Sequence, residues 1–174
     1  VLQEAAKRQL QLQAVWLTHG HLDHAGDVAD LLKQQAVPVW GPHADDGYLL
    51  ESLPQTTASY ASYGFPIAEA FVPDGWLSEG GKLKVGAYEF DVLHIPGHTP
   101  GHVVFYCAAE KLLIAGDVLF YESIGRTDFP RGNHADLISN ITGKLLVLPE
   151  DTRVIPGHGR MTTIGHEKRH NPVL

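Results

Sequence analysis

Cysteine is almost absent from this sequence, with Cys107 the only one among 174 residues. A single thiol excludes an intrachain disulfide framework and any zinc site built from several cysteines. No apolar run approaches the roughly 18 residues that a membrane-spanning helix requires, so we expect no membrane contact. No signal peptide is recognisable either, and the cytoplasm is the expected location.

Basic residues are also few. Lys and Arg total 13 against 20 Asp and Glu, which gives a net charge of −7. This balance disfavours a surface that follows phosphates, and we predict no nucleic-acid partner. A chain of 174 residues, 44% of them hydrophobic, can bury its own core without disulfides. We therefore predict one domain over residues 1–174, while the oligomeric state stays open.

The first third of the chain predicts a strand–helix–strand unit. Residues 14–18 and 37–40 are short apolar runs of strand type, and residues 25–35 have apolar side chains at helical spacing. This order implies parallel strands with a helix across the sheet. A second helix is predicted at 43–53, and residues 54–81 are predicted as loop with short strands.

From residue 82 onward the hydrophobic period changes to two, which indicates antiparallel hairpins. The predicted elements are strands at 82–85, 88–93, 103–107, 111–115 and 152–155, a loop at 116–133, and helices at 134–148 and from 163. The sequence thus predicts an α/β domain of mixed strands with helices outside.

Metal-ligand residue types concentrate where the first predicted strand enters the next helix. Three histidines and one carboxylate lie there within six residues: His19, His21, Asp23 and His24. His19 and His21 are two apart in an extended stretch, so they project the same way and can bind one cation. The other two lie where the chain turns into the helix and can face a second cation.

Three further strand ends deliver the same residue types. His98 follows the strand that ends at residue 93, Asp117 follows the one that ends at 115, and His158 follows the last strand. Neighbouring glycines allow close backbone approach in each of these loops. Because strand ends on one rim of a sheet are where loops converge, the pattern predicts a single metal centre.

These motifs, HxHxDH, GHTPGH, GD and PGHG in this order, resemble the metallo-β-lactamase superfamily over residues 14–170. Within it, the segment GRTDFPRG at 125–132 is similar to glyoxalase II-like hydrolases. The end of the chain resembles their short bacterial members, which lack an extra C-terminal domain. The resemblance implies a four-layer αββα sandwich with the metals at the edge where the two sheets meet.

The resemblance also implies a ligand set. It assigns His19, His21 and His98 to a first metal, assigns Asp23, His24 and His158 to a second, and makes Asp117 the bridge. His102 stays outside this set, in a packing or supporting role. Five imidazoles and two carboxylates suit Zn²⁺, Fe²⁺ or Mn²⁺, and we expect two divalent ions, with Zn²⁺ favoured.

Such a centre predicts a hydrolase. A water that bridges two cations loses its proton near neutral pH and attacks a polarised carbonyl, and Asp23 is the candidate to orient it. A thioester fits because its thiolate, with a parent pKa of about 8.5, can leave without full protonation. The resemblance implies S-lactoylglutathione as the small-molecule substrate.

Two departures from the glyoxalase II pattern affect this expectation. Only 16 residues follow His158, so we do not expect the C-terminal region that supplies the usual glutathione-binding cations. Arg126, Arg131 and Arg160 are candidate anchors instead, unless they are solvated or form intramolecular salt bridges. Only 18 residues precede His19, so we expect that the chain is N-terminally truncated and that further strands complete the first sheet.

Other functions fit the same residues. A persulfide dioxygenase would use one Fe²⁺ held by His19, His98 and Asp117, with open positions for O₂. A lactone hydrolase would use the same metal-bound nucleophile on an ester. An inactive binding module is the alternative outside enzymes, and a nuclease is disfavoured because no basic, aromatic-rich surface is visible.

Overall fold

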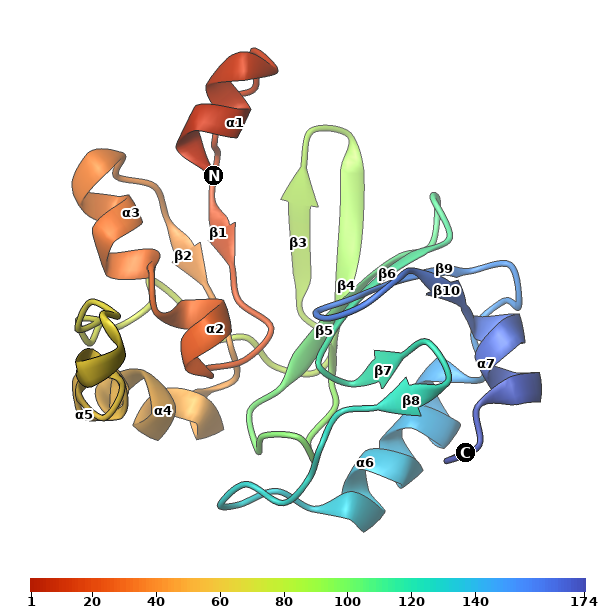
Figure 1. Ribbon diagram of the computed structural model, residues 1–174. Helices are drawn as coiled ribbons and strands as arrows, with labels where there is room; N and C mark the ends of the chain where they lie inside the picture. Colours follow the sequence, from red (N-terminus) through yellow and green to blue (C-terminus); the bar gives the residue numbers. More distant parts are fainter.

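A computed structural model describes all residues, 1–174. The N-terminal part contains a parallel pair of strands, β1 (Val15–Trp16) and β2 (Val39–Trp40), with Val15 opposite Val39. The connection contains the helices α2 (Leu22–Ala25) and α3 (Val28–Gln34). The predicted strand–helix–strand unit is confirmed, and its helices cover the outer side of the pair (Figure 1).

The helix predicted at 43–53 is confirmed, whereas the segment after it differs from its prediction. A 3₁₀ turn (Ala44–Asp46) leads into α4 (Gly47–Glu51), and a further helix, α5 (Leu53–Ala58), occupies residues predicted as loop. Pro54 lies in the first turn of α5, where its missing N–H costs no hydrogen bond. Only Leu53 and Thr57 are buried in this helix, so its apolar signal is too short to detect. The predicted short strands are wrong, since only the bridge Trp40–Gly75 forms there.

The second sheet has six strands in the order β10-β9-β6-β5-β4-β3. All neighbours are antiparallel except β6 and β9, which are parallel. Their bounds are β3 (Lys82–Val85), β4 (Tyr88–His94), β5 (Val103–Cys107), β6 (Leu112–Gly116), β9 (Arg153–Pro156) and β10 (Thr162–Thr163). The two predicted hairpins and the last predicted strand are therefore confirmed.

Strand β5 shows how both faces of this sheet are covered. All five of its residues are buried. Val104 and Tyr106 face one core with residues of the C-terminal helices, whereas Phe105 and Cys107 face another core with Trp16 of β1. Trp16 contacts Phe105 with ring centroids 5.5 Å apart. The order of layers is thus helices, the β1–β2 pair, the six-stranded sheet, and helices again (Figure 1).

Two helices cover the outer face of the large sheet. Asn133 accepts a hydrogen bond from the Asp136 N–H and caps α6 (His134–Asn140), which continues through one wider π-type turn (Ile141–Leu145). Thr163 caps α7 (Ile164–His170) in the same way. The remaining elements are the N-terminal helix α1 (Leu2–Lys7), a 3₁₀ turn (Ala61–Tyr63), and a small hairpin of β7 (Leu119–Phe120) and β8 (Ser123–Ile124).

The β7–β8 hairpin lies in a segment predicted as loop, because strands of two residues are too short to show alternation. None of the helices combines the length and the hydrophobicity that crossing a membrane requires.

The α6 face supplies a stability prediction. Leu137 is fully buried in the outer core, and a Cβ at Gly97 would lie only 2.4 Å from the Leu137 Cβ, so the helix packs directly on that loop. Leu137→Ala should lower the free energy of unfolding by about 2–5 kcal/mol. Val147→Ala, at a residue that is 70% exposed, should change it by less than about 0.5 kcal/mol. Urea denaturation measures both, and equal effects would contradict this packing.

Candidate metal centre

Four segments, each of which follows a strand, meet at one edge of the molecule. The residues from Thr18 to His24 follow β1, and His98 lies in the loop from β4 to β5. Asp117 directly follows β6, and His158 follows β9. The structure brings all seven predicted ligand residues together in two groups: His19, His21 and His98, and Asp23, His24, Asp117 and His158. Within each group the possible ligand atoms all lie within 4.8 Å of one another.

Two members of the first group are buried, and the third, His21, is half-buried. His19 is fully buried, and His98 is 3% exposed. The Nδ1 atom of His21 lies 3.0 Å from Nε2 of His98. The same His98 nitrogen is 3.6 Å from Oδ2 of Asp117. Three imidazoles and a carboxylate edge therefore enclose one small volume.

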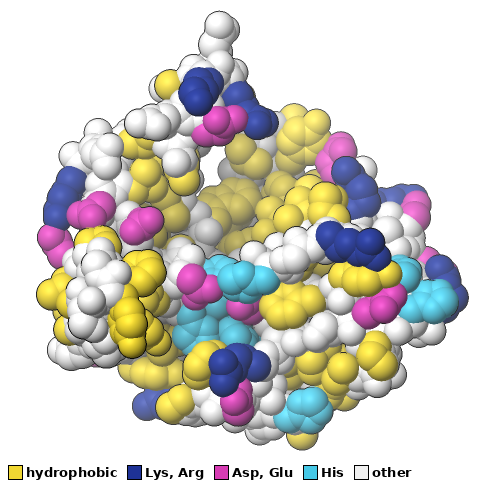
Figure 2. Space-filling view, viewed as in Figure 1, with side chains coloured by type: hydrophobic (Ala, Val, Ile, Leu, Met, Phe, Trp, Pro, Cys, Tyr) yellow, Lys and Arg dark blue, Asp and Glu magenta, His cyan; other side chains and the backbone are white.

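The second group faces solvent. Nε2 of His158 lies 3.0 Å from Oδ2 of Asp23 and 3.3 Å from Oδ2 of Asp117. Nε2 of His24 lies 3.3 Å from the other oxygen of Asp117. The side chains of Asp23 and His158 are 56% and 55% exposed. Asp117 is close to both groups, and the histidines and carboxylates come to the surface together (Figure 2).

Unsatisfied atoms show that the groups fit cations. Nε2 of His19, Nε2 of His24 and Oδ1 of Asp117 are buried without a hydrogen-bond partner. Leaving such atoms unpaired costs about 1–3 kcal/mol each, a cost that a bound cation would remove. The opposite nitrogens are already occupied, because Nδ1 of His19 lies 3.0 Å from the Thr18 hydroxyl and Nδ1 of His98 lies 2.7 Å from the Arg126 carbonyl oxygen. These contacts orient the two rings so that Nε2 of each faces the other members of the group.

Protonation states also suit cation binding. Burial, followed by the charges of His102 and His24, holds the pKa of His19 well below its usual value. Burial and the neighbouring His98 lower the pKa of His21 to about 4. Burial alone would raise the pKa of Asp117, but the imidazole of His24, whose Nε2 lies 3.3 Å from Oδ1, outweighs burial together with His98 and His158 and lowers this pKa. At neutral pH the imidazoles of His19 and His21 are therefore neutral and the Asp117 carboxylate is ionised, which are the forms that bind metal.

Comparison with known protein families agrees with this geometry. Residues 2–158 match the sequence model of the metallo-beta-lactamase superfamily. The chain belongs to that superfamily.

Individual relatives support the same assignment. The chain is 46% identical over 175 residues to a hydroxyacylglutathione hydrolase, GloC, from Haemophilus influenzae, spanning all of this chain and 81% of that protein. A solved structure of the BLEG-1 B3 metallo-beta-lactamase superposes with a TM-score of 0.87 at 42% identity, over 98% of this chain and 81% of the other. TTHA1623 in a di-iron-bound form gives a TM-score of 0.87 at 39% identity, over 99% and 83%. With its two ligand groups, this chain is a metal-dependent hydrolase of the superfamily.

Glycines let the backbone of this superfamily member approach the centre closely. A Cβ at Gly157 would lie 2.1 Å from Oδ1 of Asp117 and 2.9 Å from Cε1 of His24. A Cβ at Gly125 would lie 1.9 Å from the backbone oxygen of Asp117. Any side chain at these positions would displace Asp117.

His102 supports the centre from outside both groups, as the sequence predicts. It is fully buried, and its Nε2 accepts a hydrogen bond of 3.0 Å from the Asp117 N–H. Its ring stacks on His19 with centroids 4.6 Å apart. His102 therefore fixes the backbone of one ligand residue and the ring of another.

The sequence prediction missed a further group, His43, Asp45 and His94. The two rings stack with centroids 4.2 Å apart. One nitrogen of His43 accepts the Asp45 N–H at 3.2 Å, and Nε2 of His94 lies 2.8 Å from the Pro100 carbonyl oxygen. Because these nitrogens are occupied and the rings are parallel, the group fits a packed turn better than a cation site.

The three candidate arginines have different partners. Arg126 forms two hydrogen bonds to Asp128, of 2.6 and 2.7 Å. Arg131 lies over the Tyr48 ring at 4.1 Å. Arg160 lies over the Tyr121 ring at 3.4 Å and lines a groove of about 500 Å³. An intramolecular salt bridge was the alternative role for all three arginines, and only Arg126 forms one.

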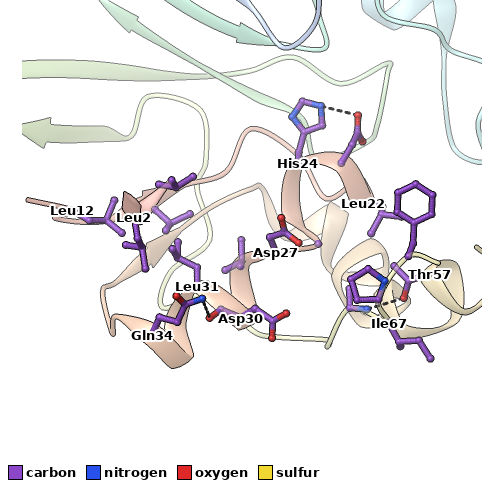
Figure 3. Close-up of a pocket in the computed structure, with 18 of the residues that line it drawn as sticks. Leu2, Leu12, Leu22, His24, Asp27, Asp30, Leu31, Gln34, Thr57 and Ile67 are labelled. Carbon is purple, nitrogen blue, oxygen red and sulfur yellow. Dashed lines mark hydrogen bonds and ion pairs between the residues drawn. The ribbon is translucent and has the colours of Figure 1, made fainter. Parts of the chain in front are cut away.

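A cavity of about 1020 Å³ lies between α1, α2, α3 and residues 65–68 (Figure 3). Its lining is mostly hydrophobic, and Asp23 and His24 are the only members of the two ligand groups that reach it. The cavity lies beside the centre, whereas the exposed side chains of Asp23 and His158 mark where the centre meets solvent.

The close approach of Gly157 gives a prediction about cation binding. Gly157→Ala should push the Asp117 carboxylate away and weaken the binding of divalent cations by roughly 10-fold or more. Gly143→Ala is the control, because a Cβ there has no neighbour within 4 Å. Competition with a chromogenic chelator measures both affinities. Wild-type affinity in Gly157→Ala would show that Asp117 is not held where the structure places it.

Proposed function

We propose that the chain hydrolyses thioesters of the glutathione type, with S-lactoylglutathione as the substrate, by means of two divalent cations. The observation that carries the proposal is the meeting of a buried and a solvent-facing ligand group at Asp117, which lies within 3.6 Å of His98 and 3.3 Å of His158. The 46% identity to a hydroxyacylglutathione hydrolase supports the choice of substrate.

In this proposal each group holds one cation. The proposed ligands are His19, His21 and His98 for the first, Asp23, His24 and His158 for the second, and Asp117 for both. Cations held by these residues would lower the pKa of a bound water and polarise the substrate carbonyl. Five imidazoles and two carboxylates suit Zn²⁺, which we propose as the native metal, and Fe²⁺ or Mn²⁺ suit the same donors.

The residues of the chain have separate tasks. Asp23 is exposed beside His158, so its carboxylate can accept a hydrogen bond from the attacking water and orient it. The N–H of Asp117 is fixed by His102, which keeps the shared carboxylate in place as charge changes. A thiolate with a pKa near 8.5 leaves without a proton donor, so a thioester needs no further acid from the chain.

A turnover panel with metal analysis tests this function. The protein should hydrolyse S-lactoylglutathione roughly 10-fold or more faster than an uncharged lactone, with two cations per chain on the same sample. Asp117→Asn should lower that activity by about 100-fold or more, because both groups lose their shared ligand. Oxygen uptake with glutathione persulfide at one iron per chain would support a dioxygenase instead, and faster lactone turnover would support a lactone hydrolase. Metal-free protein after purification with added Zn²⁺ would support a binding module.

Arg126, Arg131 and Arg160 are proposed to bind the carboxylates of the glutathione part. Arg160 is favoured because it forms no salt bridge and lies two residues after His158, whereas Nε and Nη2 of Arg126 already bind Asp128. A charge-assisted hydrogen bond contributes about 1.5–3 kcal/mol.

Arg160→Ala should therefore raise KM for S-lactoylglutathione roughly 10-fold at unchanged kcat, because it removes binding shared by the ground and transition states. Arg126→Ala should have a smaller effect. The control substrate is an uncharged N-acetylcysteamine thioester, whose KM should stay constant in both variants. An equal rise in KM for the charged and uncharged thioesters would exclude Arg160 as a carboxylate anchor.

A further inference from the structure

A buried carboxylate outside both ligand groups connects the loops that carry the first group. Asp46, at the end of the 3₁₀ turn before α4, is fully buried. Its Oδ2 accepts the Gly20 N–H at 2.9 Å and the Thr99 hydroxyl at 2.8 Å. Its Oδ1 accepts the Gly101 N–H at 2.6 Å. The mechanism proposed above gives this side chain no role.

The donors stand next to the ligands of the first group. Gly20 lies between His19 and His21, and Thr99 follows His98 directly. One carboxylate thus joins two loops that are 77 residues apart in sequence at the contact of His21 with His98. A backbone hydrogen bond of 3.0 Å from the His43 N–H to the Gly101 carbonyl oxygen also holds the start of the Asp46 turn against the His98 loop.

Glycine makes this approach possible on both sides. A Cβ at Gly101 would lie 2.6 Å from both the backbone N and Oδ1 of Asp46. A Cβ at Gly20 would lie 2.8 Å from Cβ of Leu49 in α4. The carboxylate can reach both amide groups because each belongs to a glycine, Gly20 or Gly101.

We propose that Asp46 is a positioning residue for the metal centre, which holds the His19–His21 loop and the His98 loop at the separation that the first cation requires. The proposal rests on the cation binding proposed above. It predicts that Asp46 affects the first group selectively, because no atom of Asp46 hydrogen-bonds a residue beside Asp23, Asp117 or His158. A carboxylate that only stabilised the fold would affect both groups equally.

Asp46→Asn separates these two roles with little change in volume. With its amide oxygen in the Oδ2 position, the Asn keeps the hydrogen bonds from Gly20 and Thr99 but faces the Gly101 N–H with its NH₂ donor. With the oxygen in the Oδ1 position, it keeps the Gly101 hydrogen bond but faces the Gly20 N–H with that donor. Either orientation therefore removes one of the two backbone hydrogen bonds that hold the loops.

The matched control is Glu167→Gln. Glu167 is also fully buried and also accepts three hydrogen bonds, from the Glu122 N–H at 2.9 Å, the Thr162 hydroxyl at 2.5 Å and the Asn171 amide at 2.8 Å. None of these donors adjoins the first group in sequence.

The experiment is a titration of metal-free protein with Co²⁺, followed by its visible absorption, with chelator competition to obtain the affinity of each binding step. His158→Gln identifies the step that belongs to the second group. Asp46→Asn should weaken the other step about 10- to 100-fold, the usual effect of losing an outer hydrogen-bond partner of a metal site. It should change the second-group step less than about 3-fold. Glu167→Gln should leave the first-group step unchanged even where thermal unfolding shows equal destabilisation.

Equal weakening of both steps in Asp46→Asn, or the same profile in Asp46→Asn and Glu167→Gln, would overturn the proposal. If Asp46→Asn does not fold, the variants Thr99→Val and Thr99→Ser test the role of Asp46 instead. The valine variant removes one donor and should weaken the first-group step several-fold, whereas the serine variant should retain it. Wild-type protein that binds two Co²⁺ ions but does not cleave thioesters would refute the proposed function, and the comparison of Asp46→Asn with Glu167→Gln would still decide the role of Asp46. Wild-type protein that binds no Co²⁺ would refute both the proposed function and the role of Asp46.

Discussion

The parallel pairing of β6 with β9 places the shared carboxylate of the centre. Where these strands end, the Gly157 N–H donates to the Gly116 carbonyl oxygen at 2.7 Å, so Asp117 and His158 leave the sheet side by side. Strands β6 and β9 are the only parallel neighbours in this otherwise antiparallel six-stranded sheet. Since parallel strands end at the same edge, this one pairing brings together two candidate ligands that are 41 residues apart.

The rest of the fold fixes the other two segments against that edge. Trp16 of β1 packs on Phe90 and Phe105 of the large sheet, so the loop after β1 arrives at the same rim. Leu137 of α6 packs against the loop that carries His98. The hydrophobic cores on both faces of β5 therefore determine how far apart the histidines lie, and the polar contacts of Asp46 and His102 complete the alignment.

The sequence predicts the parts of this arrangement that depend on local pattern. Alternating or continuous apolar runs locate β4, β5, β6 and β9, and the residue types at their ends locate the seven candidate ligands. Short elements such as α5 and β7 escape because two or three buried residues give no measurable period. The role of Asp46 also escapes, since its partners Gly20 and Gly101 lie 26 and 55 residues away and their backbone groups leave no trace in the sequence.

The candidate ligands lie at strand ends, whereas the candidate arginines lie in the loops beyond them. Arg126, Arg131 and Arg160 contact Phe129, Tyr48 and Tyr121, and none of the three side chains forms a salt bridge with Asp23 or Asp117. Substitutions in those loops can therefore alter which molecule is held without disturbing the scaffold of the reaction. This separation lets homologous proteins differ in substrate specificity while the residues at the strand ends keep the same chemistry.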